Sequence, residues 1–84
     1  MQTLMEVGEA VATRRRSLGL KQGAVAALAG ISQETLSRFE RGNVAEFGSR
    51  KLLAVLAVMG MELKISETVA SGSLDELRRE RGGA

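Results

Sequence analysis

Hydrophobic residues recur at helical spacing along most of the chain and fall into four groups. In the first group Leu4, Val7, Val11 and Leu18 stand three, four and seven residues apart, which predicts an amphipathic helix. Glycine follows the first three groups, and glycine is the residue that most often lies just beyond the end of a helix. The four predicted helices cover residues 4–18, 21–29, 32–41 and 49–59.

The second and third predicted helices are joined by a very short turn. Valine and alanine residues give the second helix an apolar face, and only Gly30 and Ile31 separate it from the third. The hydroxyl of Ser32 can accept a hydrogen bond from a free N–H group in the first turn of the third helix. Two short helices joined by a tight turn that contains glycine form a helix-turn-helix candidate.

The fourth predicted helix has almost no polar face after its first turn. The apolar run at residues 52–61 has ten residues, which is about half of what a membrane-spanning helix needs. We therefore expect a buried helix and no membrane segment. A helix that is apolar all round must be covered on more than one side, and one small protomer can hardly do this. Part of the helix is expected to face another chain.

The hydrophobic period changes to two over residues 61–66. Here Met61, Leu63 and Ile65 alternate with Glu62, Lys64 and a serine, which predicts a half-buried strand. No second strand is predicted, so this one lacks an intramolecular partner. Antiparallel pairing with a second copy, centred on Leu63, sets Glu62 opposite Lys64 of the other chain, and opposite charges facing across strands are favourable. The pattern predicts a homodimer. A chain that merely leaves the last helix in an extended form is the alternative.

Residues 67–84 are expected to form a flexible or partly helical tail behind one domain at residues 1–66. Ser73 and Glu76 make a capping-box pattern, and Asp75 can pair with Arg79 one turn later. A helix this short is marginal unless it docks on another surface.

Composition argues against an enzyme. The 84 residues include no cysteine and no histidine, so the usual nucleophile and the usual general base at neutral pH are both missing. Disulfides and thiolate metal sites are excluded as well. We expect no catalytic residues, no metal and no cofactor. The first residues are charged and do not form a signal peptide, so we expect a cytoplasmic protein.

The basic residues are concentrated in the first two-thirds of the chain. Residues 1–51 hold eight Lys/Arg against five Asp/Glu, and residues 52–84 hold four against five. This asymmetry mildly favours a polyanionic partner for the first part.

One face of the third predicted helix is polar, because five polar side chains fall within an arc of roughly 140°. These are Gln33, Glu34, Ser37, Arg38 and Arg41. Amide, hydroxyl, carboxylate and guanidinium groups are those that read base edges in the major groove. Periodicity alone leaves this interpretation open beside that of an ordinary solvated face.

The segment "RRRSLGLKQGAVAALAGISQETLSRFERGN" resembles the XRE family of helix-turn-helix proteins, which includes the phage Cro and repressor proteins. The resemblance covers roughly residues 4–59. It rests on Arg15, on "LGLKQ" at 18–22, on Gly-x-Ser at 30–32 and on "ERG" at 40–42. It implies an all-α, lambda-repressor-like bundle, to which the pattern at residues 61–66 adds one C-terminal strand that is expected to pair across a homodimer. Gly23 departs from the family, whose members often carry a better helix former there. It either loosens the second helix or allows close approach to a phosphate.

The resemblance also implies roles for individual residues. The base-reading positions correspond to Gln33, Glu34, Ser37 and Arg38, and the phosphate-contacting glutamine corresponds to Gln22. Further contacts with the DNA backbone are expected from Asn43, Ser49 and Arg50, with Lys21, Arg14 and Arg41 as additional candidates. Arg15 and Glu40 match positions that often form a structural ion pair between the first and third helices.

The segment "FGSRKLLAVLAVMGMELKI" at 47–65 resembles HipB-like antitoxins. This second resemblance implies autorepression of an operon and binding to a HipA-type kinase toxin. We therefore expect a homodimeric repressor of double-stranded DNA that reads a pseudo-palindromic operator. A stand-alone regulator without a toxin and a protein-interaction module on the same scaffold are the alternatives.

Overall fold

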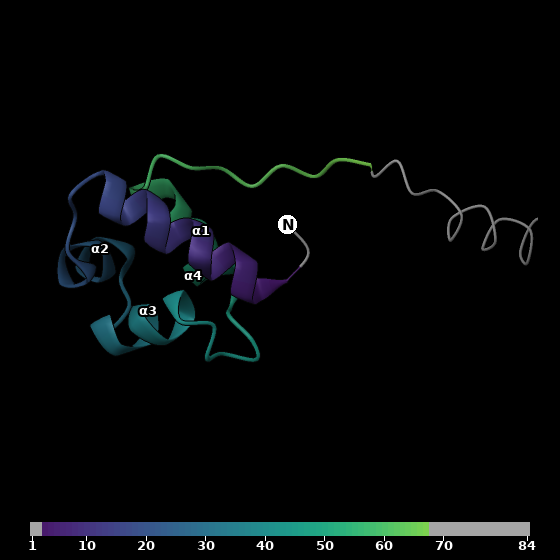
Figure 1. Cartoon of the computed structure of the whole chain (residues 1–84). Coiled ribbons are helices and arrows are strands. Elements are labelled where there is room, and N and C mark those ends of the chain that lie inside the picture. The colour runs from purple at the N-terminus through teal and green to yellow at the C-terminus, as the bar shows by residue number, and fades with distance from the viewer. Residues whose placement is uncertain (1–2, 68–84) are drawn as a thin grey trace, which may run out of the picture.

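The computed structural model describes residues 3–67, and these residues form a small bundle of four helices (Figure 1). The helices are α1 (Leu4–Ser17), α2 (Gln22–Ala29), α3 (Gln33–Glu40) and α4 (Ser49–Val58). The prediction of an all-α domain is confirmed, and each helix lies within the predicted range. No described helix is long and apolar enough to cross a bilayer.

Local side-chain chemistry explains where the helices begin and end. The Ser32 hydroxyl accepts a hydrogen bond from the Thr35 amide at 3.0 Å, so the predicted cap of α3 is confirmed. Thr3 caps α1 in the same way, through the Glu6 amide at 3.1 Å. Gly30 ends α2 with φ of +74°, a left-handed conformation that glycine adopts without steric cost. The turn between α2 and α3 is therefore fixed at both ends.

The core lies where the four helices meet. Its largest fully buried side chains are Phe39, Leu36, Met59, Val11, Val25 and Val55. Figure 1 shows α1 crossing in front of α4, with α2 and α3 beside them. Packing joins α2 to α4, α1 to α3 and α2 to α3. Leu18 departs from the periodic pattern, because α1 ends at Ser17 and Leu18 is its 43% exposed cap.

A glycine in the middle of α1 sets the distance between α1 and α3. A Cβ atom at Gly8 would collide with the backbone carbonyl of Phe39 and would lie 3.5 Å from the Cα atom of Glu40. Gly8 is buried in this contact. Because the neighbour is backbone and not the end of a flexible side chain, α1 and α3 can pack this closely only when residue 8 has no side chain.

The segment after α4 is extended and leaves the bundle, as the green trace in Figure 1 shows. Met61 still packs on the core, and its amide donates to the Leu56 carbonyl at 2.8 Å. Beyond it, Leu63 is 55% exposed and Ile65 is 95% exposed. Within residues 3–67 of a single protomer this segment pairs with no strand. Of the predicted tail at 67–84, all but the first residue lies outside the described residues.

Candidate nucleic-acid interface

A buried ionic network holds α3 in place against α1 and α2. The guanidinium of Arg15 on α1 donates from Nε to Glu40 Oε2 at 2.7 Å and from Nη2 to Glu40 Oε1 at 2.9 Å. Gln22, the first residue of α2, donates its amide to Glu40 Oε1 at 2.8 Å. Arg15 also donates to the Leu20 carbonyl at 2.8 Å, just before α2. One carboxylate on α3 therefore binds side chains from both neighbouring helices.

The network keeps Glu40 ionised although the residue is buried. Burial by itself would raise the pKa of Glu40, but hydrogen bonds from Arg15 and Gln22 and the positive charges of Arg15 and Arg16 outweigh burial and lower the pKa below its usual value. The hydrogen bond to Glu40 raises the pKa of Arg15, although burial opposes this. Both partners are therefore charged at neutral pH, and their hydrogen bonds are of the strong, charge-assisted kind.

With one side fixed, α3 presents its other side to solvent. Leu36 and Phe39 are fully buried beneath the helix. On the opposite side Gln33, Glu34 and Arg38 are exposed, and Ser37 is half-buried. The helix thus offers amide, carboxylate and guanidinium groups on a rigid backbone. Pre-positioned groups of this kind are what a recognition surface requires.

The start of α2 adjoins the start of α3. An open hollow of about 580 Å³ lies here, lined by Arg15, Lys21, Gln22, Gly23, Ala24 and Gln33. Lys21 is exposed beside the first turn of α2, whose N–H groups receive no side-chain cap. A cation and free helix N–H groups both attract anions.

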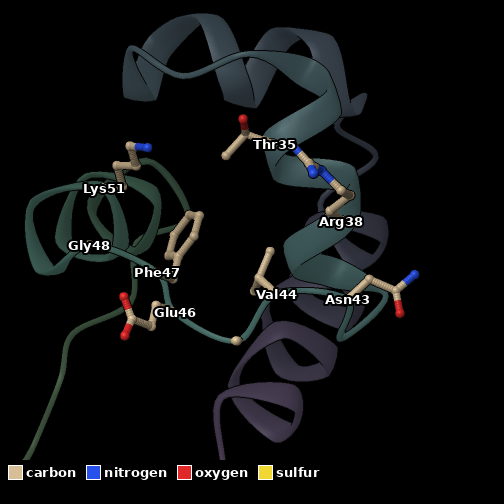
Figure 2. Close-up of a pocket in the computed structure, with 9 residues that line it drawn as sticks. Thr35, Arg38, Asn43, Val44, Glu46, Phe47, Gly48 and Lys51 are labelled. Carbon is tan, nitrogen blue, oxygen red and sulfur yellow. The ribbon is translucent and has the colours of Figure 1, made fainter.

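A groove of about 370 Å³ lies on the other flank of α3. Figure 2 shows Thr35 and Arg38 on α3 facing the loop and Lys51 of α4 across the groove. Phe47 positions the loop, because its ring stacks on Phe39 with centroids 4.1 Å apart and planes 6° apart. The loop is thereby tied to the same helix that carries the exposed polar residues.

Basic residues also surround the turn between α2 and α3. A second hollow of about 370 Å³ is lined by Gly30 and Ile31 of the turn and by Arg50, Lys51 and Ala54 of α4. Lys51 lines this hollow and the groove beside α3 alike. Two cationic side chains, Arg50 and Lys51, therefore lie beside the turn, and Glu46 is the acidic residue that lines the groove.

Residues 1–67, which include the four helices of the described part of the chain, match the family described as a helix-turn-helix domain. The chain belongs to this family. No curated protein matches it. In this domain α2 and α3 are the two helices of the motif, and Gly30 and Ile31 lie in the turn between them.

The structure brings several of the predicted site residues together around α3: Lys21, Gln22 and Gln33 line one hollow, Arg38 and Asn43 line the groove, and Arg50 lines the hollow at the turn. Gln33, Glu34, Ser37 and Arg38 lie on the solvent side of α3, with Lys21 and Gln22 at the near end of α2. Asn43 lines the groove beside α3, and Ser49 and Arg50 begin α4. Arg41 is the exposed cap residue of α3. Arg15 and Glu40 lie underneath this surface.

Arg14 makes a contact within the domain that the sequence did not predict. Its Nε donates to the Met59 carbonyl at 3.0 Å, at the end of α4. A cation favours the negative end of a helix dipole. The structure therefore gives Arg14 a part in holding α4 against α1.

Sequence reasoning missed Lys51 and Thr35, which line the groove beside α3. The signal for Lys51 was present, because it completes a "SRK" run that opens the fourth helix. Thr35 carried no such signal, since on a helical wheel it lies outside the polar arc. Only the path of the loop at 43–48 brings it to the groove.

Proposed function

We propose that this protein is a sequence-specific DNA-binding repressor that lays α3 in the major groove. Gln33, Glu34, Ser37 and Arg38 would contact base edges: Gln suits adenine, Arg suits guanine, and Glu accepts from cytosine. The observation that carries the proposal is the contrast between the two sides of α3. One side is fixed by the Glu40 network, and the other is polar and open to solvent.

Contacts with phosphates would flank the bases on both sides. Lys21 and Gln22 would bind the DNA backbone at the start of α2, and Asn43, Arg41, Ser49 and Arg50 would do so from α4 and the loop. Lys51 joins this second set because it lines two hollows beside α3. Phosphate contacts position a protein on DNA but carry no sequence information themselves. Arg14 remains an additional candidate: its Nε is bound to the end of α4, but the residue is exposed.

The repressor would act as a homodimer joined through residues 61–65. The exposed side chains of Leu63 and Ile65 support this, because residues two apart on an extended segment share one side of it, and adjoining exposed apolar side chains favour a partner. Lys64 Nζ lies 3.5 Å from Glu62 Oε1 in the single chain, so both charges are on the side of the segment opposite the apolar residues. Two copies of α3 would then read half-sites roughly 34 Å apart.

Within this proposal the protein is the antitoxin of a HipBA-like operon. The support is the likeness of residues 47–65 to HipB-like antitoxins, together with the dimer segment that such a protein would need. The partner would be a HipA-type kinase toxin. Co-expression with a kinase encoded in the adjacent reading frame tests this. Rescue of growth and a stable complex would support it, whereas an operon without such a kinase would leave a stand-alone regulator.

Selection of bound sites from random duplex DNA tests the DNA-binding function itself. We expect a pseudo-palindromic site whose two halves are one helical turn apart. Binding should weaken steeply with salt, because each neutralised phosphate releases a counterion. Failure to enrich any sequence, together with salt-independent binding to a protein partner, would point to an interaction module on this scaffold.

A further inference from the structure

Gly23 is unusual because α2 has no evident need for a glycine at its second residue. Its φ is not positive, so the backbone conformation is one that any residue adopts. Glycine in a helix is less favourable than alanine, since it loses more conformational freedom on folding. The reason for the glycine must lie in what surrounds it.

The one neighbour that a side chain at Gly23 would meet is Gln33. A Cβ atom built on Gly23 would lie 3.3 Å from Gln33 Oε1 and 3.8 Å from Gln33 Cδ, with no other such atom within 4 Å. The end of the Gln33 side chain thus rests against the bare backbone of α2. Both residues line the open hollow at the start of the two helices.

We infer that Gly23 is a specificity-determining residue that positions the side chain of Gln33 for base reading. The inference rests on the proposed DNA-binding function and extends it. Glutamine has many rotamers, and ordering it on binding costs affinity unless it is already held in place. The surface on which it rests is firm, since the adjacent Gln22 is bound to Glu40 at 2.8 Å. A methyl group at residue 23 would lie 3.3 Å from Gln33 Oε1, which is tighter than an ordinary contact, so the amide would have to shift.

Because the methyl group of Gly23→Ala would meet only the exposed end of the Gln33 side chain, which can move aside into solvent, the change should not harm the fold. Alanine favours the helix, so we expect a melting temperature equal to or above that of the wild type. On the duplex selected by the wild type, affinity should fall about two- to tenfold, the cost of ordering one long side chain. Gln33→Ala should relax the base preference at one position of the site. Gly23→Ala should reduce discrimination between bases at that same position and at no other.

A double-mutant cycle separates this role from close approach of a phosphate to Gly23. In the Gln33→Ala background, the further change Gly23→Ala should have almost no effect on binding. An equal loss in both backgrounds, or an equal loss on random and selected duplexes, would overturn the inference. So would unchanged affinity and discrimination in Gly23→Ala itself.

A measurement on the free protein tests the position of Gln33 independently of DNA binding. NMR should show nuclear Overhauser contacts between the Gly23 α-protons and the Gln33 side-chain amide, and Gly23→Ala should abolish this arrangement. Absence of the contacts in the wild type would refute the positioning role even if the protein reads DNA. If the contacts are present but site selection enriches no DNA sequence, the result would count against the DNA-binding function and not against the position of Gln33.

Discussion

Arg15 binds both carboxylate oxygens of Glu40 at 2.7 and 2.9 Å, and this pair joins the first helix to the third inside the domain. Only 11% of the Arg15 side chain and 2% of the Glu40 side chain are exposed. The same carboxylate receives the amide of Gln22 from the second helix. The orientation of the proposed recognition helix therefore depends on a carboxylate that is almost completely buried.

Removing Glu40 should destabilise the fold severely. Glu40→Ala leaves the buried guanidinium of Arg15 without its partner, and breaking a buried pair costs about 3–5 kcal/mol. The free energy of unfolding, measured by urea titration with circular dichroism, should fall by that amount. The double variant Arg15→Met with Glu40→Leu should recover most of the loss, since apolar replacement of both partners removes the unpaired charge. A small effect of Glu40→Ala would show that the pair does not fix α3.

The stability of the domain should depend on pH through Glu40. Its folded pKa is lowered, so between the folded and the unfolded pKa the unfolded chain binds a proton that the folded protein does not. The stabilisation is fully present above the unfolded pKa of about 4.3 and is lost as pH falls through the folded pKa. Urea titrations across this pH range give the free energy of unfolding. That free energy should depend less on pH in Glu40→Gln than in the wild type. Parallel curves for the two proteins would contradict this.

Alanine at Gly8 should destabilise the protein although alanine is the better helix former. The added methyl would collide with the Phe39 carbonyl, and the two helices would have to move apart. Such overpacking costs typically about 1–3 kcal/mol. Gly23→Ala is the matched control, because there the methyl meets only a flexible side chain. The melting temperature should fall for Gly8→Ala and hold or rise for the control, and equal melting temperatures would contradict the close approach.

The proposed dimer strand predicts a specific pattern of charge variants. Lys64→Glu would set Glu62 of one chain opposite a second carboxylate of the other and should weaken the dimer, because like charges directly opposite are unfavourable. Adding Glu62→Lys to that variant restores opposite charges and should restore the dimer. Sedimentation equilibrium gives the dissociation constant of each variant.

A backbone change tests the same strand without altering charge. Leu63→Pro removes a hydrogen-bond donor at the centre of the pairing and should block it. An unchanged dimer in this variant would refute strand pairing as the mode of association.

The helices could be predicted from the sequence because each one carries its own signals. Periodicity marks their apolar faces, Ser32 marks the start of α3, and Gly30 marks the end of α2. The family resemblance pointed to Arg15 and Glu40 as partners, and the structure brings the two side chains together.

Features that depend on tertiary contacts could not be read in this way. The need for glycine at residue 8 arises from the backbone of Phe39, which is distant in sequence. The groove that contains Lys51 exists because Phe47 stacks on Phe39 and fixes the loop. Arg14 belongs to a basic run that suggests DNA contacts, but its Nε also donates a hydrogen bond to the Met59 carbonyl at the end of α4. Each of these depends on how separate elements pack.

The claim that α3 reads bases is tested most directly by comparing Arg38→Ala with Lys51→Ala on selected and random duplexes. Loss of a base contact should cost about 1–3 kcal/mol on the selected site and relax one base preference. Loss of a phosphate contact should weaken binding to all sequences alike and reduce the salt slope by about one. We predict the first result for Arg38→Ala and the second for Lys51→Ala. Equal losses on both kinds of duplex for Arg38→Ala, and likewise for Gln33→Ala, would contradict base reading by α3.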